Sequence, residues 1–217
     1  MKTILSTMAL VAGAVVATLA ADVAIAQAPP AEAWQVGPTI RGRNYSVGVQ
    51  RTLDATRDGA SFAMPGPTRA QGHVHAVTVP VGSLEGASRI TLRYRIDAAP
   101  GTRFYGQENG GPGWLSLFIQ QRGDNWTAKG RYSTYRWYSP DNRIANLSPG
   151  THTVSIGLDE DWNAVVAHKA LKNPAAFREA LANAGSVGFV FGSSSGLGHG
   201  VYATAPTRFT ILDFRID

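Results

Sequence analysis

Alternation of apolar and polar residues in one short stretch sets the strongest limit on how this chain can fold. In RITLRYRID, residues 89–97, an apolar or aromatic side chain occupies every second position, and the positions between them are arginine, threonine or aspartate. Side chains of a β-strand point alternately to its two faces, so this pattern predicts a strand with one buried and one solvated side. HTVSIGLD, residues 152–159, repeats the arrangement with Val154, Ile156 and Leu158 inward.

Several further segments carry a strand signature. Apolar runs with β-branched and aromatic residues occupy 73–81, 114–121, 186–192 and 207–217, and turns rich in glycine, proline or asparagine separate them. The alternation of strand and helix expected of a parallel α/β fold does not occur. With 24 glycines available for turns, the chain is predicted to be all-β: an antiparallel β-sandwich of the jelly-roll type with one short helix.

Two local features can be placed within this plan. The apolar positions of the segment 207–217 change parity near residues 211–212, which predicts a β-bulge there. NPAAFREALANAG is the segment with helical spacing, and we expect its helix to begin after an N-cap at Asn173 and to stop at Gly185.

The start of the chain has the pattern of an export signal. Lys2 precedes an uncharged apolar run, and Ala24-Ile25-Ala26 matches the small-residue pattern of a cleavage site, whereas Asp22 and the abundance of alanine disfavour a membrane anchor. We expect residues 1–26 to be a signal peptide cleaved after Ala26, residues 27–40 a short linker, and residues 41–217 a single β-sandwich domain. The predicted location is the bacterial periplasm or the exterior, with no integral membrane segment after cleavage.

The segment 123–140, GDNWTAKGRYSTYRWYSP, interleaves aromatic and cationic side chains. In a strand, Tyr135 and Trp137 share one face, and Arg136 and Tyr138 share the other. One face of this strand can enter a core. The other face then holds an aromatic ring beside a guanidinium outside the core, and that arrangement calls for an explanation. Aromatic faces suit the C–H groups of sugar rings, and guanidinium groups bind carboxylates or sulfates in a fork. The alternative is that these rings only fill a core.

In its strand rhythm and in this polar aromatic strand, the chain resembles the jelly-roll and concanavalin-like carbohydrate-binding sandwich domains of secreted bacterial proteins. The likeness is architectural and covers most of the chain after residue 26, and it implies glycan binding on a concave sheet. We therefore predict an exported carbohydrate-binding protein whose ligand is an anionic glycan, held without bond cleavage. The expected ligand-binding residues are Gln120, Trp126, Arg131, Tyr135, Arg136, Trp137 and Tyr138.

Other functions stay open at this point. A structural or adhesive envelope protein would use the same aromatic residues as core. A glycoside hydrolase needs two facing carboxylates, and a polysaccharide lyase acting on acidic polysaccharide needs a tyrosine or histidine base with arginine or amide groups against the uronate carboxylate. The hydrolase candidates are Glu108, Asp124, Asp141 and Asp159, and the lyase candidates are Gln120, Arg131, Tyr132, Tyr135, Arg136 and His75.

The remaining motifs predict no metal and no cofactor. His73 and His75 of GHVHA share a strand face, but no glutamate follows at ligand spacing, and LDEDWN at 158–163 lacks the alternating oxygens of a calcium loop. GSSSG at 192–196 has nucleophile-elbow spacing without a following helix, so we expect a loop. The net charge is +5, but the basic residues are dispersed, which argues against a nucleic-acid partner and favours an acidic polysaccharide.

Overall fold

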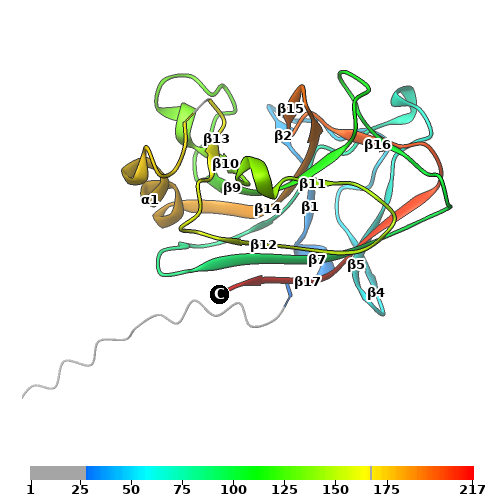
Figure 1. Ribbon diagram of the computed structural model, residues 1–217, viewed down its shortest axis with the longest axis horizontal. Helices are drawn as coiled ribbons and strands as arrows, with labels where there is room; N and C mark the ends of the chain where they lie inside the picture. The colour runs from blue at the N-terminus through cyan, green and yellow to red at the C-terminus, as the bar shows by residue number, and fades with distance from the viewer. Residues whose placement is uncertain (1–27, 167) are drawn as a thin grey trace, which may run out of the picture.

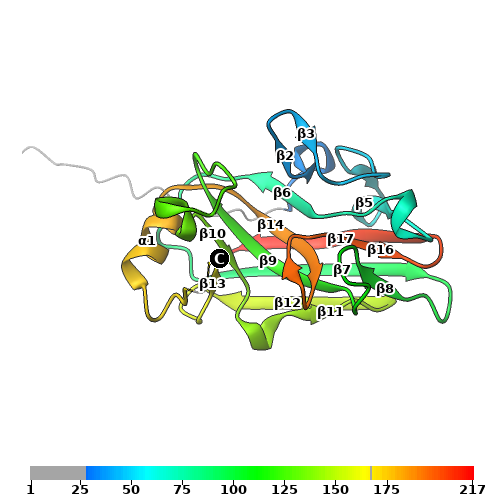
Figure 2. The same ribbon diagram turned by 90° about the horizontal axis from the view of Figure 1, so that it is seen from above.

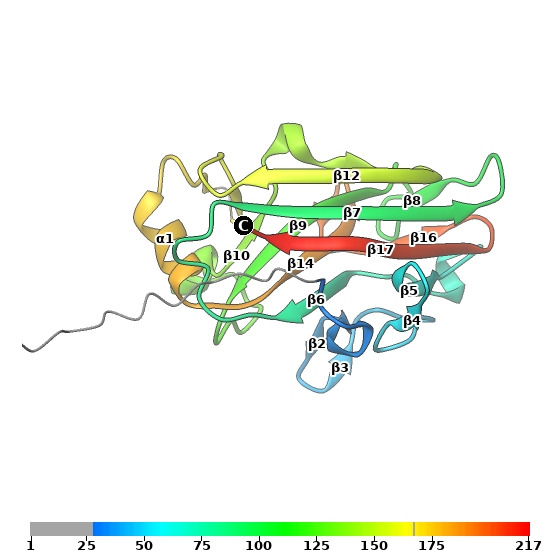
Figure 3. The same ribbon diagram turned by 90° about the horizontal axis from the view of Figure 1, so that it is seen from below.

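Two antiparallel sheets face each other in the computed structural model, which describes residues 28–166 and 168–217 (Figure 1). The signal peptide expected at 1–26 lies outside the described residues. From edge to edge, the five-stranded sheet consists of β12 (Gly150–Gly157), β7 (Arg89–Ala98), β17 (Thr207–Ile216), β5 (Gly59–Met64) and β4 (Asp54–Thr56). Figure 3 shows this sheet from its outer side.

The second sheet has eight strands and carries the loops that matter for function. Its main path is β1 (Gln35–Gly37), β6 (Ala76–Pro80), β14 (Ala184–Ser193), β9 (Trp114–Gln121), β10 (Arg136–Tyr138) and β13 (Asn163–Ala164). Two short strands, β11 (Ala145–Asn146) and β15 (Gly196–Leu197), pair with β9 and β14. Figure 2 views the molecule from this side.

Smaller elements complete the chain. The strands β2 (Thr39–Ile40) and β3 (Arg43–Asn44) pair with each other, as do β8 (Phe104–Gly106) and β16 (Val201–Ala203). The short 3-10 turns are η1 (Ala31–Ala33), η2 (Arg69–Gln71), η3 (Gly130–Thr134) and η4 (Asp141–Arg143). The helix α1 (Pro174–Ala182) lies at one end of the sandwich (Figures 1 and 2). No helix among the described residues is long and apolar enough to span a membrane.

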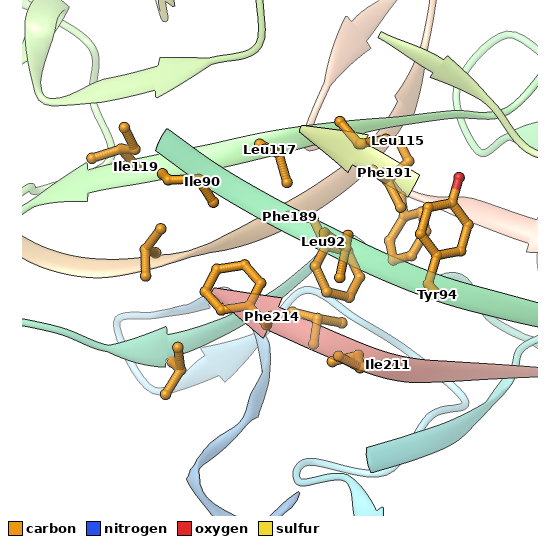
Figure 4. Packing of buried hydrophobic residues seen from close by; sticks show 14 of the residues in the cluster. Ile90, Leu92, Tyr94, Leu115, Leu117, Ile119, Phe189, Phe191, Ile211 and Phe214 are labelled. Atoms are coloured by element: carbon orange, nitrogen blue, oxygen red, sulfur yellow. The ribbon is translucent and has the colours of Figure 1, made fainter. Parts of the chain in front are cut away.

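The predicted fold class, an antiparallel sandwich with one α-helix, is confirmed, and the alternating pattern explains how its core forms. The four alternate residues of β7, from Ile90 to Ile96, are all buried. Phe189 and Phe191 of β14 meet Phe209 of β17 across the two sheets, with ring centroids 5.2 and 5.7 Å apart. Figure 4 shows side chains of both sheets interdigitating in this core. Aromatic and branched side chains from facing sheets thus fill the space between the two layers.

Several local predictions can be compared directly. The pairing of β17 with β7 shifts register between Ile211 and Asp213, which confirms the predicted bulge. The helix begins as expected after Asn173, but it ends at Ala182, and Gly185 already belongs to β14. The helix therefore ends three residues before Gly185, because the chain enters β14 at Ala184.

The prediction that residues 27–40 form a linker needs correction. Within it, β1 pairs with β6, and the preceding Trp34 is fully buried with its ring 5.1 Å from that of Phe214. Three strand residues carry no detectable period, so the sequence pattern missed a segment that the sheet recruits.

Candidate functional site

A cleft of about 820 Å³ opens on the outer face of the eight-stranded sheet. In this sheet Val190 pairs with Ala76, and Phe118 pairs with Tyr138, so their side chains lie on the face opposite to Phe189 and the core. These four residues form an apolar cluster of their own, separate from the main core, and they make the floor of the cleft.

Segments that are distant from one another in sequence form the walls around this floor. Figure 1 shows β2, and β15 of the eight-stranded sheet, on the side away from the five-stranded sheet. The wall residues are Pro38, Ile40, Arg43, Tyr45, Val47, His73 and His75 on one side, Gln107, Glu108 and 195–199 on a second, and Trp126, Arg136, Asp141 and 163–165 on a third. The sandwich fold therefore brings together seven stretches of chain that are separated in sequence.

The strand β10 divides its aromatic residues between the two faces. Trp137 points into the core, where it is fully buried against Phe177 with ring centroids 4.8 Å apart, and its indole Nε1 donates to the Thr134 carbonyl at 2.7 Å. Arg136 and Tyr138 point to the cleft. Burial raises the pKa of the Tyr138 hydroxyl, so this group stays protonated at neutral pH and can donate a hydrogen bond.

A buried ion pair supports the third wall. The Nε of Arg136 lies 3.0 Å from Asp124 Oδ2, and the two side chains are only 9% and 1% exposed. The contact is electrostatic without hydrogen-bond geometry at Nε. Gln120 Nε2 donates to the same carboxylate oxygen at 2.9 Å, and the Arg136 guanidinium carbon lies 4.8 Å from the ring centroid of Trp126. These contacts hold Arg136 and Trp126 in place as one unit.

The backbone of Trp126 is strained in a way that sets the direction of its ring. Its φ is +64°, a left-handed conformation that costs a non-glycine residue about 1–2 kcal/mol. Asp124 Oδ1 stabilises this turn by accepting the Trp126 N–H at 3.1 Å. Strained residues of this kind concentrate at functional sites, because the surrounding structure must compensate for them. Here the left-handed backbone places the half-buried indole of Trp126 at the edge of the cleft floor.

The first wall presents apolar surface to solvent. Tyr45 and Val47 are 40% and 46% exposed, large values for such side chains, and both line the cleft. Val47 exchanges two backbone hydrogen bonds with His73 at 2.8 and 2.9 Å, which anchors this wall to the sheet. This close contact between the two segments requires glycine at position 72. Its φ is +139°, and a Cβ at Gly72 would overlap the Val47 carbonyl oxygen.

His75 of the first wall is buried, and it contacts the second wall. Its Nδ1 donates to the Gly198 carbonyl at 2.8 Å, since a carbonyl can only accept, and its Nε2 has no partner among the described residues. Burial lowers the pKa of His75 to about 4, so the imidazole is neutral at physiological pH. The neighbouring His73 ring lies 4.8 Å away, and burial lowers its pKa as well.

Charged groups at the rim are paired. Glu108 Oε1 lies 2.6 Å from His199 Nδ1, and the hydrogen bond from His199 lowers the pKa of Glu108. Across the cleft, Asp141 Oδ2 lies 2.6 Å from Lys169 Nζ, and this contact lowers the pKa of Asp141. Asn163 Nδ2 donates to Asp141 Oδ1 at 2.8 Å, which fixes the orientation of the carboxylate.

The seven predicted ligand-binding residues are only partly brought together. Trp126, Arg136 and Tyr138 line the cleft, and Gln120 lies with Trp126 in a smaller adjoining hollow. Arg131 and Tyr135 belong to η3 and its end, outside both hollows. The prediction that Trp137 binds the ligand is wrong, because its ring lies in the core without exposed surface and cannot contact a ligand.

Sequence reasoning missed most of the polar and apolar walls. Tyr45 and Asn163 were not considered. Glu108 and Asp141 were considered only for catalysis, and His75 only for catalysis or metal binding. Nothing in the local pattern marks these residues, because they meet only through the fold. Of the hydrolase candidates, Glu108 and Asp141 line the cleft, and Asp124 is buried beside it. Within the part of the chain that the structure describes, no group of three or more histidine, aspartate or glutamate side chains is placed to hold a metal ion.

Comparison with known proteins finds carbohydrate-binding modules among solved structures. No family model and no curated protein sequence matches the chain. A xylan-binding module, CBM15, is similar at a TM-score of 0.43 with 17% identity, over 87% of this chain and 96% of that one. A carbohydrate-binding module described as specific for non-crystalline cellulose, CBM28, gives 0.45 and 10%, over 85% and 87%. CtCBM11 gives 0.37 and 11%, over 83% and 96%.

Proposed function

We propose that the protein binds carbohydrate in the cleft on the outer face of the eight-stranded sheet. The observation that carries this proposal is the placement of Trp126, which a strained backbone turns toward an aromatic floor next to paired polar groups. Sugar rings have apolar C–H faces and polar edges, so they fit a site where indole and phenol rings lie beside carboxylate, amide and guanidinium groups. Trp126 and Tyr45 offer the rings, and Asp141 and Asn163 offer hydrogen bonds.

The dimensions suit an oligosaccharide segment. Pockets for small ligands span about 300–1,000 Å³, and the cleft lies near the upper end of that range at about 820 Å³. The exposed apolar surface of Tyr45 and Val47 on its wall also favours a ligand that covers it. We propose binding without bond cleavage. Of the lyase candidates, Arg131, Tyr132 and Tyr135 do not line the cleft, and Arg136 and His75, which do, are held by Asp124 and by the Gly198 carbonyl. The hydrolase candidates Glu108 and Asp141 line the cleft but are engaged by His199 and Lys169.

Two finer expectations remain proposals. Export through a signal peptide cleaved after Ala26 rests on the sequence alone, and N-terminal sequencing of the protein from a periplasmic extract tests it. The preference for an anionic glycan rested on Arg131 and Arg136. Arg131 lies outside the cleft and Arg136 is paired with Asp124, so neither arginine is free to bind an anion there.

Substitution of two matched tryptophans tests the proposal. We expect Trp126→Ala to weaken glycan binding about 30-fold, the loss typical of a 2 kcal/mol aromatic anchor. Trp114→Ala is the control, because Trp114 of β9 is also a half-buried tryptophan and does not line the cleft. Binding is measured by isothermal titration calorimetry and by retardation in gels that contain polysaccharide. Equal behaviour of both variants, or no retention of the unmodified protein by any glycan, would refute the proposal.

A further inference from the structure

The cleft carries as many negative as positive side chains. Its lining contains two arginines, Arg43 and Arg136, and two carboxylates, Glu108 and Asp141. Two of these four charges have an ionic partner within the protein, since Asp124 pairs with Arg136 and Lys169 pairs with Asp141. Glu108 accepts a hydrogen bond from His199. A site built for an anionic chain would instead present several free cations.

Arg136 cannot readily exchange its partner for a sugar carboxylate. Asp124 is the more deeply buried member of the pair, with a side chain that is 1% exposed. If Arg136 turned to a ligand, Asp124 would remain as a buried charge without compensation, which is strongly unfavourable. The guanidinium is also stacked near Trp126 at 4.8 Å, so moving it would release the ring that the proposed site needs.

Arg43, the remaining cation of the cleft, would attract an anion only weakly. Arg43 is exposed on the β2–β3 hairpin with its guanidinium carbon 5.3 Å from the Tyr45 centroid, and no carboxylate pairs with it among the described residues. Salt screens such an exposed charge, and Glu108 and Asp141 on the opposite walls repel the same anion.

Arginines away from the cleft contribute to the net charge of +5. Arg93 of β7 and Arg208 and Arg215 of β17 are exposed at positions that alternate with the core residues of their strands, so they lie on the outer face of the five-stranded sheet. This is the opposite side of the sandwich from the cleft (Figures 1 and 3). The basic composition is therefore no argument for an anionic ligand in the cleft.

We infer that the ligand of the cleft is an uncharged glycan, whose hydroxyl groups are bound by Asp141 and Asn163 while its ring lies against Trp126. This inference rests on the proposed function and replaces the anionic preference expected from the sequence. Asp141 is a ready acceptor for sugar hydroxyls because Lys169 and Asn163 hold its carboxylate in one orientation. A hydroxyl group can complete this network without displacing any ion pair.

Matched polymers that differ only in charge test the inference. Two suitable pairs are hydroxyethylcellulose with carboxymethylcellulose, and methyl-esterified pectin with polygalacturonate. We expect the neutral member of a pair to bind, with an affinity that is constant between about 20 and 500 mM NaCl, because no ion pair forms with the ligand. Tighter binding of the acidic member, weakened by salt, would overturn the inference and leave the proposed function intact. Retention of no polymer would refute the proposed function and the inference together.

A charge-matched pair of variants tests the residue assignment. Asp141→Asn should weaken binding of the neutral polymer about tenfold, the loss expected for one hydrogen bond to a charged group. Asp213→Asn is the control, because Asp213 is likewise ion-paired, with Arg215 at 2.9 Å, but lies on the opposite sheet. Unchanged affinity in Asp141→Asn, or an equal loss in both variants, would overturn the assignment of Asp141.

Discussion

Acidification should destabilise the fold through His75, whose side chain is buried while neutral. The residue is 8% exposed, and burial is the largest cause that lowers its pKa from 6.5 to about 4. The nearby His73 and His199 lower it further, whereas Glu108 and the bond to the Gly198 carbonyl raise it. Between these two pKa values the unfolded chain takes up a proton at this residue and the folded chain does not. The free energy of unfolding therefore falls as the pH falls from about 6.5 to about 4.

The size of this effect follows from the difference between the two pKa values. At 1.36 kcal/mol per pKa unit, the shift corresponds to about 3 kcal/mol of stability that is present at neutral pH and lost in acid. That is a large share of the 5–15 kcal/mol typical of a domain. Neutral pH should accordingly favour the folded protein, and the loss should be complete below about pH 4.

Comparison with His75→Gln isolates this contribution from other titrating groups. Urea unfolding followed by tryptophan fluorescence gives the free energy of unfolding of both proteins between about pH 7 and pH 4. We expect the difference between them to change by about 3 kcal/mol over that range, with the unmodified protein losing more stability in acid. A difference that stays constant with pH would show that the imidazole does not remain neutral in the folded state, and would refute the reasoning.

Three further substitutions test the packing around the cleft. Trp137→Ala should lower the free energy of unfolding by about 3–5 kcal/mol in urea titrations, and a loss below 1 kcal/mol would contradict its place in the core. Asp124→Asn should lower the free energy of unfolding by about 3–5 kcal/mol, because it leaves Arg136 buried without its counter-charge. Adding Arg136→Met should recover much of that loss, and a fully stable single variant would argue against the buried pair. Gly200→Ala should lower the melting temperature, since its φ is +91° and a Cβ would lie 2.7 Å from His75 Nε2, and an unchanged melting temperature would contradict this contact.

Features with a local cause were predictable from the sequence. The long strand β7 follows from alternation within its segment, and β9 and β17 follow from apolar runs with β-branched and aromatic residues. The bulge near Ile211 follows from a change of parity inside one strand. The separation of Trp137 from Tyr138 onto opposite faces also follows from the strand period alone. Each of these depends only on neighbours within a few residues, so one segment contains the whole signal.

The site depended on information that no single segment contains. Its floor comes from β6, β9, β10 and β14, and its walls come from stretches between residues 38 and 199. Which face of β10 would enter the core was decided only when the five-stranded sheet covered that side, and this made Trp137 a core residue and left Tyr138 to the cleft. Likewise, Arg136 changed from a candidate anion-binding group to half of a buried pair because the turn at residues 122–126 brings Asp124 against it.

The sequence by itself determined the class of fold, because backbone geometry converts a period of two into a strand with a buried side, and many such strands must pack face to face. The tertiary structure alone decided the partners of each charge and the exposure of each ring. Those properties depend on distances between residues far apart in the chain, and electrostatic and packing energies change steeply with such distances.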